Sequence, residues 1–350
     1  MARALRKTLT FADQRFRIRG LVEGPYAIDV GRSRFLHGPC VTQCRRGHWI
    51  VAYQDAQDDP GRESVIRQRR STDGGVTWYD EGIIYEETRQ GFGARNPAFG
   101  QTPSGRILMV IQRVGLRRLG VVRGENIMGS KLLISQDCGY TYENRGSVDR
   151  YTRRGHQGCS SHLVYHHGKL LMPAYHPQGL ALYISSDEGE TWPDRIVMVK
   201  PGEVPERPTY PTLAARPDGS LLMIGHLNQA VRCFGRVSYD EGLTWGPVIF
   251  FEDLTLRHPV LGYVGETMIC VGRNMKTWKP ALCVSPDYGR TWSGMIDLAP
   301  DRSYGGGYTA LWPSRDPERV FVAFSTDGAR PFTQDILGLF LSKITIQSVK

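Results

Sequence analysis

The sequence has no apolar run near the ~20 residues that a membrane-spanning helix needs. Its first ten residues, MARALRKTLT, are basic, but the apolar stretch of a secretory signal does not follow them. The seven cysteines are an odd number and contain no Cys-x-x-Cys pair. We therefore expect a soluble chain, cytoplasmic by default, whose cysteines are reduced and buried as small apolar side chains.

Metal-binding and nucleic-acid-binding signals are weak as well. Acidic residues do not cluster at the spacing of a calcium site, so no metal and no cofactor is expected. The 44 basic and 35 acidic residues give a net charge of +9, which favours acidic partners. However, the basic residues are spread along the chain, whereas a nucleic-acid-binding protein gathers them on one face. We expect an acidic oligosaccharide or polysaccharide as the partner, rather than nucleic acid or a membrane.

What the sequence does contain is a repeated phrase, Ser-x-Asp-x-Gly-x-Thr-Trp. It occupies residues 71–78, 185–192, 238–245 and 285–292, with Tyr in the last place at 135–142 and a degraded sixth copy starting at Ser325. The Asp carboxylate can accept hydrogen bonds from the following backbone N–H groups, and Gly takes a positive φ. Thr and an aromatic residue suit the start of a strand. The phrase therefore predicts turns that build the fold rather than catalytic groups.

The spacing of the repeat predicts the architecture. Copies that start at residues 71, 135, 185, 238 and 285 are separated by 64, 50, 53 and 47 residues, which leaves room for one four-stranded blade each time. Forty glycines and 21 prolines suit an all-β chain with many tight turns. We predict one domain over residues 1–350, in which residues 1–33 supply a strand to the last blade.

The phrase resembles the Asp-box of the sialidase (neuraminidase) superfamily, and the resemblance covers nearly the whole chain. Members of this superfamily are six-bladed β-propellers of four-stranded antiparallel blades. The Asp-box forms the turn between the last two strands of a blade. The resemblance therefore implies an all-β, six-bladed propeller.

Six segments share a pattern that places polar residues at one end of the propeller channel. Each has a polar residue near a Pro or a small residue and then turns apolar, and an apolar strand that ends in a polar residue follows most of them. The innermost strands of a propeller line its channel, so these residues gather at one mouth. The predicted mouth residues are His37, Asp55, Arg95, Arg113, His162, His176, Tyr210, His226, Arg257 or His258, Arg273 and Tyr308. Several guanidinium groups in one cavity suit a carboxylate, because Arg offers a planar fork that stays charged.

The resemblance also implies catalytic roles. Sialidases use an Asp acid/base in a loop of the first blade, and the segment Asp58-Asp59-Pro60-Gly61 matches that loop. Asp58 or Asp59 inherits the acid/base role. Tyr308 stands where the family's Tyr nucleophile begins the last blade.

Three other positions depart from the family pattern. His37 stands where the first Arg of the family's triad is expected, and His226 where the second is expected. Tyr210 stands at the position of the Glu that assists the nucleophile, with Glu206 four residues earlier as the nearby carboxylate. Arg273 could serve as a triad member. These departures predict a specificity other than ordinary sialic acid.

Three functions remain open on the sequence alone. The first is a sialidase-like exo-glycoside hydrolase that acts on an acidic glycan, with Tyr308 as nucleophile, Glu206 as its base, and Arg95, Arg257 and Arg273 holding the acid group. The second is a polysaccharide lyase that acts on a uronic-acid chain by β-elimination, for which the His and Tyr residues would serve as base and acid. The third is a non-catalytic glycan-binding propeller.

Overall fold

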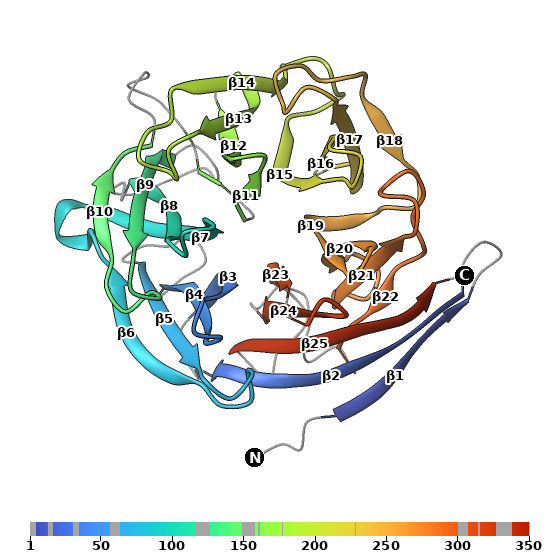
Figure 1. Ribbon diagram of the computed structural model, residues 1–350, viewed down its shortest axis with the longest axis horizontal. Coiled ribbons are helices and arrows are strands. Elements are labelled where there is room, and N and C mark those ends of the chain that lie inside the picture. Colours follow the sequence, from blue (N-terminus) through green and yellow to red (C-terminus); the bar gives the residue numbers. More distant parts are fainter. Residues whose placement is uncertain are drawn as a thin grey trace.

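Six antiparallel sheets surround a central axis like the blades of a propeller (Figure 1). The computed structural model describes residues 5–12, 17–30, 35–56, 64–115, 127–148, 158–159, 162–176, 178–227, 229–299, 307–313, 316–326 and 338–349. Within these ranges the one helical segment is a single 3-10 turn, Thr88–Gln90. The prediction of an all-β, six-bladed propeller is confirmed. No helix of the described residues is long and apolar enough to cross a membrane.

The strands of each blade follow one another from the central axis outward. Blade 1 contains β3 (Phe35–Gln43), β4 (Trp49–Ala56), β5 (Val65–Ser71) and β6 (Tyr79–Tyr85). Blade 2 contains β7 (Phe92–Gln101), β8 (Ile107–Gly115), β9 (Ile127–Ser135) and β10 (Glu143–Gly146). Blade 3 contains β11 (Val164–His166), β12 (Lys169–His176), β13 (Gly179–Ser185) and β14 (Asp194–Val199).

The remaining blades follow the same order, with one extra strand in the last. Blade 4 contains β15 (Pro208–Ala215), β16 (Leu221–Leu227), β17 (Arg232–Ser238) and β18 (Ile249–Phe251). Blade 5 contains β19 (Leu256–Val264), β20 (Thr267–Asn274), β21 (Pro280–Ser285) and β22 (Ile296–Asp297). Blade 6 contains β23 (Thr309–Pro313), β24 (Arg319–Ser325), β25 (Gly338–Val349), β2 (Arg17–Val30) and β1 (Leu5–Ala12).

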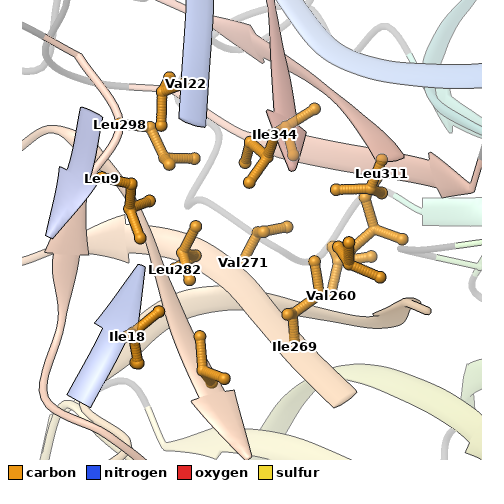
Figure 2. Packing of buried hydrophobic residues seen from close by; sticks show 14 residues of the cluster. Leu9, Ile18, Val22, Val260, Ile269, Val271, Leu282, Leu298, Leu311 and Ile344 are labelled. Carbon is orange, nitrogen blue, oxygen red and sulfur yellow. The ribbon is translucent and has the colours of Figure 1, made fainter. Parts of the chain in front are cut away.

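The second strand of each blade is the most apolar because blades cover both of its faces. Every residue of β4 and β16 is buried, and so is every residue of β20 except the first. The sequences of these strands are therefore mostly apolar and do not alternate between apolar and polar residues. The side chains between blades form the core. Figure 2 shows one such cluster, in which Leu9 and Val22 of the N-terminal strands pack with Leu282 of blade 5 and Ile344 of blade 6.

The two ends of the chain close the ring in blade 6. β2 pairs antiparallel with β25, and β1 pairs with β2 at the outer edge (Figure 1). Side chains also attach β2 to blade 1: the Tyr53 hydroxyl donates a hydrogen bond to Asp29 Oδ2 at 2.5 Å, and Arg69 Nη2 lies 3.1 Å from the same oxygen. The N-terminal segment therefore contributes two strands to the last blade.

The five repeat copies form turns of the same geometry between the third and fourth strands of blades 1–5. In the copy at 185–192, Ser185 Oγ donates to Asp187 Oδ1 at 2.7 Å and accepts from the Gly189 backbone N–H at 2.8 Å. The Thr191 backbone N–H and hydroxyl donate to the Asp187 carboxylate at 2.9 and 2.5 Å. The polar side chains of the phrase thus form their hydrogen bonds within the turn, as the sequence predicts for a structural role.

The glycine of each copy has a second role, because it lies against the preceding blade. A Cβ placed on Gly189 of blade 3 would come within 2.1 Å of Leu108 Cδ2 in blade 2. The same relation holds for Gly75, Gly139, Gly242 and Gly289, whose nearest side-chain neighbours are Leu341, Ile50, Leu182 and Leu222. The repeat therefore joins neighbouring blades as well as turning the chain.

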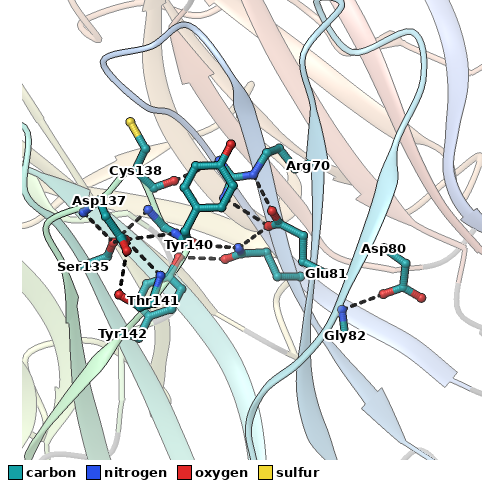
Figure 3. A network of polar contacts seen from close by, with 12 residues as sticks. Arg70, Asp80, Glu81, Gly82, Ser135, Asp137, Cys138, Tyr140, Thr141 and Tyr142 are labelled. Atoms are coloured by element: carbon teal, nitrogen blue, oxygen red, sulfur yellow. Dashed lines mark hydrogen bonds and ion pairs between the residues drawn. The ribbon is translucent and has the colours of Figure 1, made fainter.

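Polar contacts strengthen one of these junctions. Around the turn of blade 2, Arg70 of blade 1 donates to the Cys138 carbonyl at 2.9 Å, pairs with Glu81 at 2.5 Å, and lies over the Tyr140 ring (Figure 3). Gln68 donates to the Gly139 carbonyl at 2.7 Å. These bonds hold the repeat turn of one blade on the third strand of the previous blade.

The expected sixth copy at Ser325 is not in the register of the others. Ser325 ends β24, which is the second strand of its blade, whereas the five copies follow a third strand. The Ser325 hydroxyl accepts instead from the Tyr308 backbone N–H at 3.0 Å. In blade 6 the third strand, β25, is the last of the chain and the fourth, β2, comes from the other end, so no turn joins them. The rest of this copy, from residue 327 onward, lies outside the described residues.

Candidate active site at the channel mouth

A bulge recurs in the innermost strands of four blades. The register shifts between His37 and Cys40, Arg95 and Ala98, Thr209 and Thr212, and Arg257 and Val260. At each bulge the residue before a proline has a positive φ: 51° at Gly38, 42° at Asn96, 51° at Tyr210 and 55° at His258. A non-glycine residue before proline ordinarily avoids this conformation. Strain of this kind concentrates at binding and catalytic sites, where it re-aims side chains.

The bulges bring aromatic side chains from four blades into one cluster. Tyr308, which directly precedes β23, stacks on His258 with ring centroids 4.1 Å apart and planes 4° apart. The centroid of the His37 ring lies 4.3 Å from that of Tyr308. The Tyr308 hydroxyl is hydrogen-bonded to the Tyr210 hydroxyl at 2.8 Å. Tyr308 therefore contacts rings from three other blades.

Tyr210 keeps its proton in this pair of hydroxyls. Burial raises the pKa of Tyr210 well above its ordinary value, and Tyr308 and Tyr175 raise it further, while Arg95 acts in the opposite direction. Either hydroxyl can donate in this bond, and Tyr210 must donate whenever the Tyr308 oxygen carries no proton. Tyr210 is itself held by its backbone N–H, which donates to the Tyr175 hydroxyl at 2.7 Å.

Two buried histidines beside this pair are neutral. Burial, followed by Arg257 and Arg273, lowers the pKa of His226 to about 3. Burial, followed by Arg273, also lowers the pKa of His258 well below its ordinary value. Within the described part of the chain, His226 Nε2 and His258 Nδ1 are buried and have no hydrogen-bond partner. Each imidazole therefore offers an unused polar atom inside the site.

Three arginines supply the positive charge of the mouth. Arg257 and Arg273 lie opposite each other on β19 and β20, and Arg273 is buried with its guanidinium 5.2 Å from the Trp278 ring centroid. Arg95 acts on Tyr210 from blade 2, and its Nε is buried without a partner among the described residues. Nearby, Asn96 Nδ2 donates to Gln112 Oε1 at 3.0 Å. These groups suit a ligand that carries negative charge and hydroxyl groups.

Other predicted residues have partners outside the cluster. Arg113 pairs with Glu87 at 2.5 Å and lies over the Phe92 ring. His176 contacts Arg195 Nη1 at 3.0 Å and accepts from the Gln178 backbone N–H.

His162 lines a small cavity deeper in the channel with Pro39, Pro97 and Thr309. Burial lowers its pKa to about 4. Asp55 pairs with Arg67 at 2.7 Å.

The carboxylates that the sequence predicts as acid or base are Glu206, Asp58 and Asp59. The Glu206 carboxylate accepts from the backbone N–H groups of Gln229 and Ala230 at 2.9–3.1 Å, which places it on the turn between β16 and β17. Asp58 and Asp59 lie outside the described residues. Their roles in the reaction stay predictions.

The structure adds residues that the sequence did not single out. Tyr175 and Asn96 join the mouth, and Thr209 contacts the His226 ring at 3.4 Å. The signal for Asn96 is the Asn-Pro dipeptide, which has the same place in its blade as Tyr210-Pro211. In the described part of the chain, no group of three or more His, Cys, Asp or Glu side chains could hold a metal ion.

Comparison with solved structures gives the relatives of this fold. A protein of unknown function from Dyadobacter fermentans matches with a TM-score of 0.74 and 16% identity, over 96% of this chain and 100% of the other. The K499G mutant of NanB sialidase from Streptococcus pneumoniae matches with a TM-score of 0.68 and 11% identity, over 92% of this chain and 70% of the other. An alpha-L-arabinanase from Penicillium chrysogenum, complexed with arabinobiose, has a TM-score of 0.68 and 15% identity, over 97% and 98%.

At these identities the likeness shows the fold alone. No curated protein matches the sequence. The BNR repeat-like domain family matches residues 47–317, which is most of the chain and includes all five repeat copies. The chain therefore belongs to the BNR repeat-like domain family.

Proposed function

We propose that this protein is a carbohydrate-active enzyme that cleaves a glycosidic bond in an acidic glycan at the channel mouth. The observation that carries the proposal is the hydrogen bond between the hydroxyls of Tyr308 and Tyr210. The family resemblance puts a Tyr nucleophile at 308 and its assisting group at 210, and these two side chains, 98 residues apart, are in contact. The sialidase and the arabinanase among the structural neighbours have the same kind of fold.

In the hydrolytic form of the proposal, Tyr308 is the nucleophile. Its oxygen attacks the anomeric carbon as the phenol proton passes to solvent, the glycosidic C–O bond breaks, and the leaving oxygen takes a proton from Asp58 or Asp59. That carboxylate regains a proton from the water that then attacks the glycosyl–Tyr308 bond, and Tyr308 is reprotonated from solvent. Water then releases the sugar, so the products gain one water molecule. Once the Tyr308 oxygen has lost its proton, the Tyr210 hydroxyl donates to it across their 2.8 Å contact and stabilises its negative charge.

The charge of the mouth supports an acidic sugar as substrate. Arg257 and Arg273 are adjacent, and Arg95 approaches Tyr210 from another blade. Guanidinium groups bind carboxylates through two parallel hydrogen bonds, and they keep their charge at any pH of interest. A neutral sugar would leave these cations without an ionic partner from the ligand.

The neutral histidines favour elimination as a second candidate. In a uronic-acid chain the proton on the carbon next to the carboxylate can be removed, after which a C=C bond forms and the C–O bond to the leaving sugar breaks. A neutral imidazole with a free lone pair can accept that proton, and the leaving oxygen can take one from a tyrosine. His226 Nε2 and His258 Nδ1 have no hydrogen-bond partner among the described residues, and each has the lone pair in the tautomer that is protonated on the other ring nitrogen.

Product mass on a panel of acidic glycans tests the proposal. Hydrolysis adds one water to the products and elimination adds none, with an absorbance rise near ~235 nm from the unsaturated uronate. Tyr308→Phe should lower turnover by at least about 10²-fold, because it removes the reacting hydroxyl. Tyr165→Phe, at an exposed tyrosine on β11, is the matched control and should leave turnover unchanged. Binding without any product would contradict the enzymatic proposal in both forms.

A further inference from the structure

The hydrogen bonds of Thr209 favour one tautomer of neutral His226, the one with its proton on Nδ1. The Thr209 hydroxyl donates its one proton to the His226 carbonyl oxygen at 3.1 Å. Its oxygen then has only acceptor capacity toward His226 Nδ1, which lies 3.4 Å away. A neutral imidazole that donates from Nδ1 has its lone pair on Nε2.

That lone pair is buried and unused. His226 has no exposed surface, and Nε2 has no hydrogen-bond partner in the described part of the chain. Leaving a buried polar atom unpaired is unfavourable, because the atom has lost its hydrogen bonds to water. Buried atoms of this kind are rare and ordinarily have a functional reason.

Among the residues that the structure describes, the groups that face His226 are either neutral or positive. The Tyr210 and His258 rings have centroids 6.4 and 6.3 Å away. Across the sheet, Cys233 of β17 keeps its proton because burial raises the pKa of its thiol. Arg257 and Arg273 are the charges that act on the ring, and together with burial they hold the pKa of His226 at about 3.

We propose that His226 Nε2 is the proton acceptor of this site and that it takes up a proton when a carboxylate of the ligand pairs with Arg257 and Arg273. A bound carboxylate offsets the positive charge that keeps the imidazole neutral. Of the three causes that disfavour the imidazolium, burial alone then acts in full. The inference rests on the proposed function only in placing an acidic sugar at the mouth.

This coupling has a consequence for specificity. Coupling between two binding events is reciprocal, so an acidic ligand that raises the proton affinity of His226 binds more tightly as the pH falls. The effect holds while the ligand carboxylate, with a pKa of about 3.5, stays ionised. A neutral sugar leaves His226 a weak base. The same nitrogen would therefore accept a proton only when the charge of the ligand is correct.

Nitrogen-15 NMR of histidine-labelled protein tests the inference with D-glucuronate as the probe and D-glucose as the neutral control. In the free protein, His226 should be protonated on Nδ1 alone at pH 7. Saturating glucuronate should raise the titration midpoint of His226 by at least about one pH unit, whereas glucose should not move it. Calorimetry in buffers of different ionisation enthalpy should show proton uptake with glucuronate near pH 4–5.

Three variants sharpen the test. His226→Gln should abolish the proton uptake and keep glucuronate binding. Thr209→Val should move the proton of the neutral ring partly to Nε2. His166→Gln removes a histidine whose Nε2 lies 3.2 Å from the Gly219 carbonyl oxygen, and should leave the uptake unchanged.

A free-protein signal with the proton on Nε2, a midpoint that glucuronate does not move, or absence of glucuronate binding would each overturn the inference. Product assays decide the proposed function separately, because the tautomer and the midpoint are read without turnover.

Discussion

The repeat turns and the channel mouth differ in whether their polar side chains have hydrogen-bond partners within the protein. In the turns, the Ser, Asp and Thr side chains bond to one another and to the backbone within eight residues, as Ser185, Asp187 and Thr191 do. At the mouth, buried nitrogens of Arg95, His226 and His258 have no partner among the described residues. The turns are complete without a ligand, and the mouth is not.

This difference separates architecture from function. The side-chain hydrogen bonds of each turn form between residues of the same copy of the phrase, so the five copies can adopt one conformation in five blades. The mouth brings together residues from separate blades. Three of them, Asn96, Tyr210 and His258, are non-glycine residues with a positive φ, which the surrounding fold must enforce. Unpaired polar groups lower the stability of the mouth, which is typical of a site organised for binding or catalysis.

The largest effect expected from breaking a repeat turn is on stability. Gly189→Ala adds a Cβ at φ +89° that meets Leu108 Cδ2 at 2.1 Å, so we expect a loss of about 2–4 kcal/mol in the free energy of unfolding. Gly202→Ala is the matched control, because Gly202 has φ +87° and no atom within 4 Å of the added Cβ. It should cost only about 1 kcal/mol. Urea denaturation measures both, and equal losses would show that the contact between blades is unimportant.

An intermediate effect should appear in the pH dependence of stability. The folded pKa of His226 is about 3, below the unfolded value of about 6.5, so the unfolded chain binds more protons between these values and stability falls as the pH drops from 6.5 toward 3. In the turns, burial acts to raise the pKa of Asp73, but bonds from Thr77, Ser71 and Val76 outweigh it and hold the pKa at about 2. That contribution is present above about pH 4 and is lost only as the pH falls through 2.

Urea denaturation at pH 7, 5 and 4 distinguishes the two regions. The wild-type protein should lose stability already between pH 7 and 5, and His226→Gln should lose less over that interval. An equal decline in both proteins would mean that His226 is not the neutral, buried base described above.

The smallest effect is expected at Glu206. Its carboxylate accepts from the Gln229 and Ala230 backbone N–H groups, and an amide can keep one of these bonds. Glu206→Gln should therefore lower stability by about 0.5–1 kcal/mol and leave turnover within about twofold. Loss of turnover with intact folding would contradict this expectation and support Glu206 as the base for Tyr308. Steady-state kinetics on the responsive glycan makes the measurement.

Much of the architecture could be predicted because the repeat is local. The five copies set the blade register, and the innermost strands β3, β15 and β19 begin within one residue of the predicted openings at Phe35, Thr209 and Arg257. The degraded copy at Ser325 differs from the others because Ser325 ends the second strand of its blade rather than the third. The third and fourth strands of that blade come from opposite ends of the chain, which the residues of the repeat alone do not show.

The site was predictable in part. Register placed Tyr210 and Tyr308 at family positions, and the ring stacking and hydroxyl pair bring them together with His258. Arg113 illustrates what register cannot tell, because its charge is paired with Glu87 rather than available to a ligand. Whether a mouth residue is paired depends on side chains that arrive from other strands.

The sequence by itself determined the repeat, the blade order and the polar character of the mouth, because hydrogen bonds and apolar runs within a few tens of residues specify them. Only the tertiary structure decided which polar groups are satisfied. The positive φ of Tyr210 and His258, the raised pKa of Tyr210 and the lowered pKa of His226 all depend on burial and on contacts from other blades. Those quantities exist only once the ring is closed.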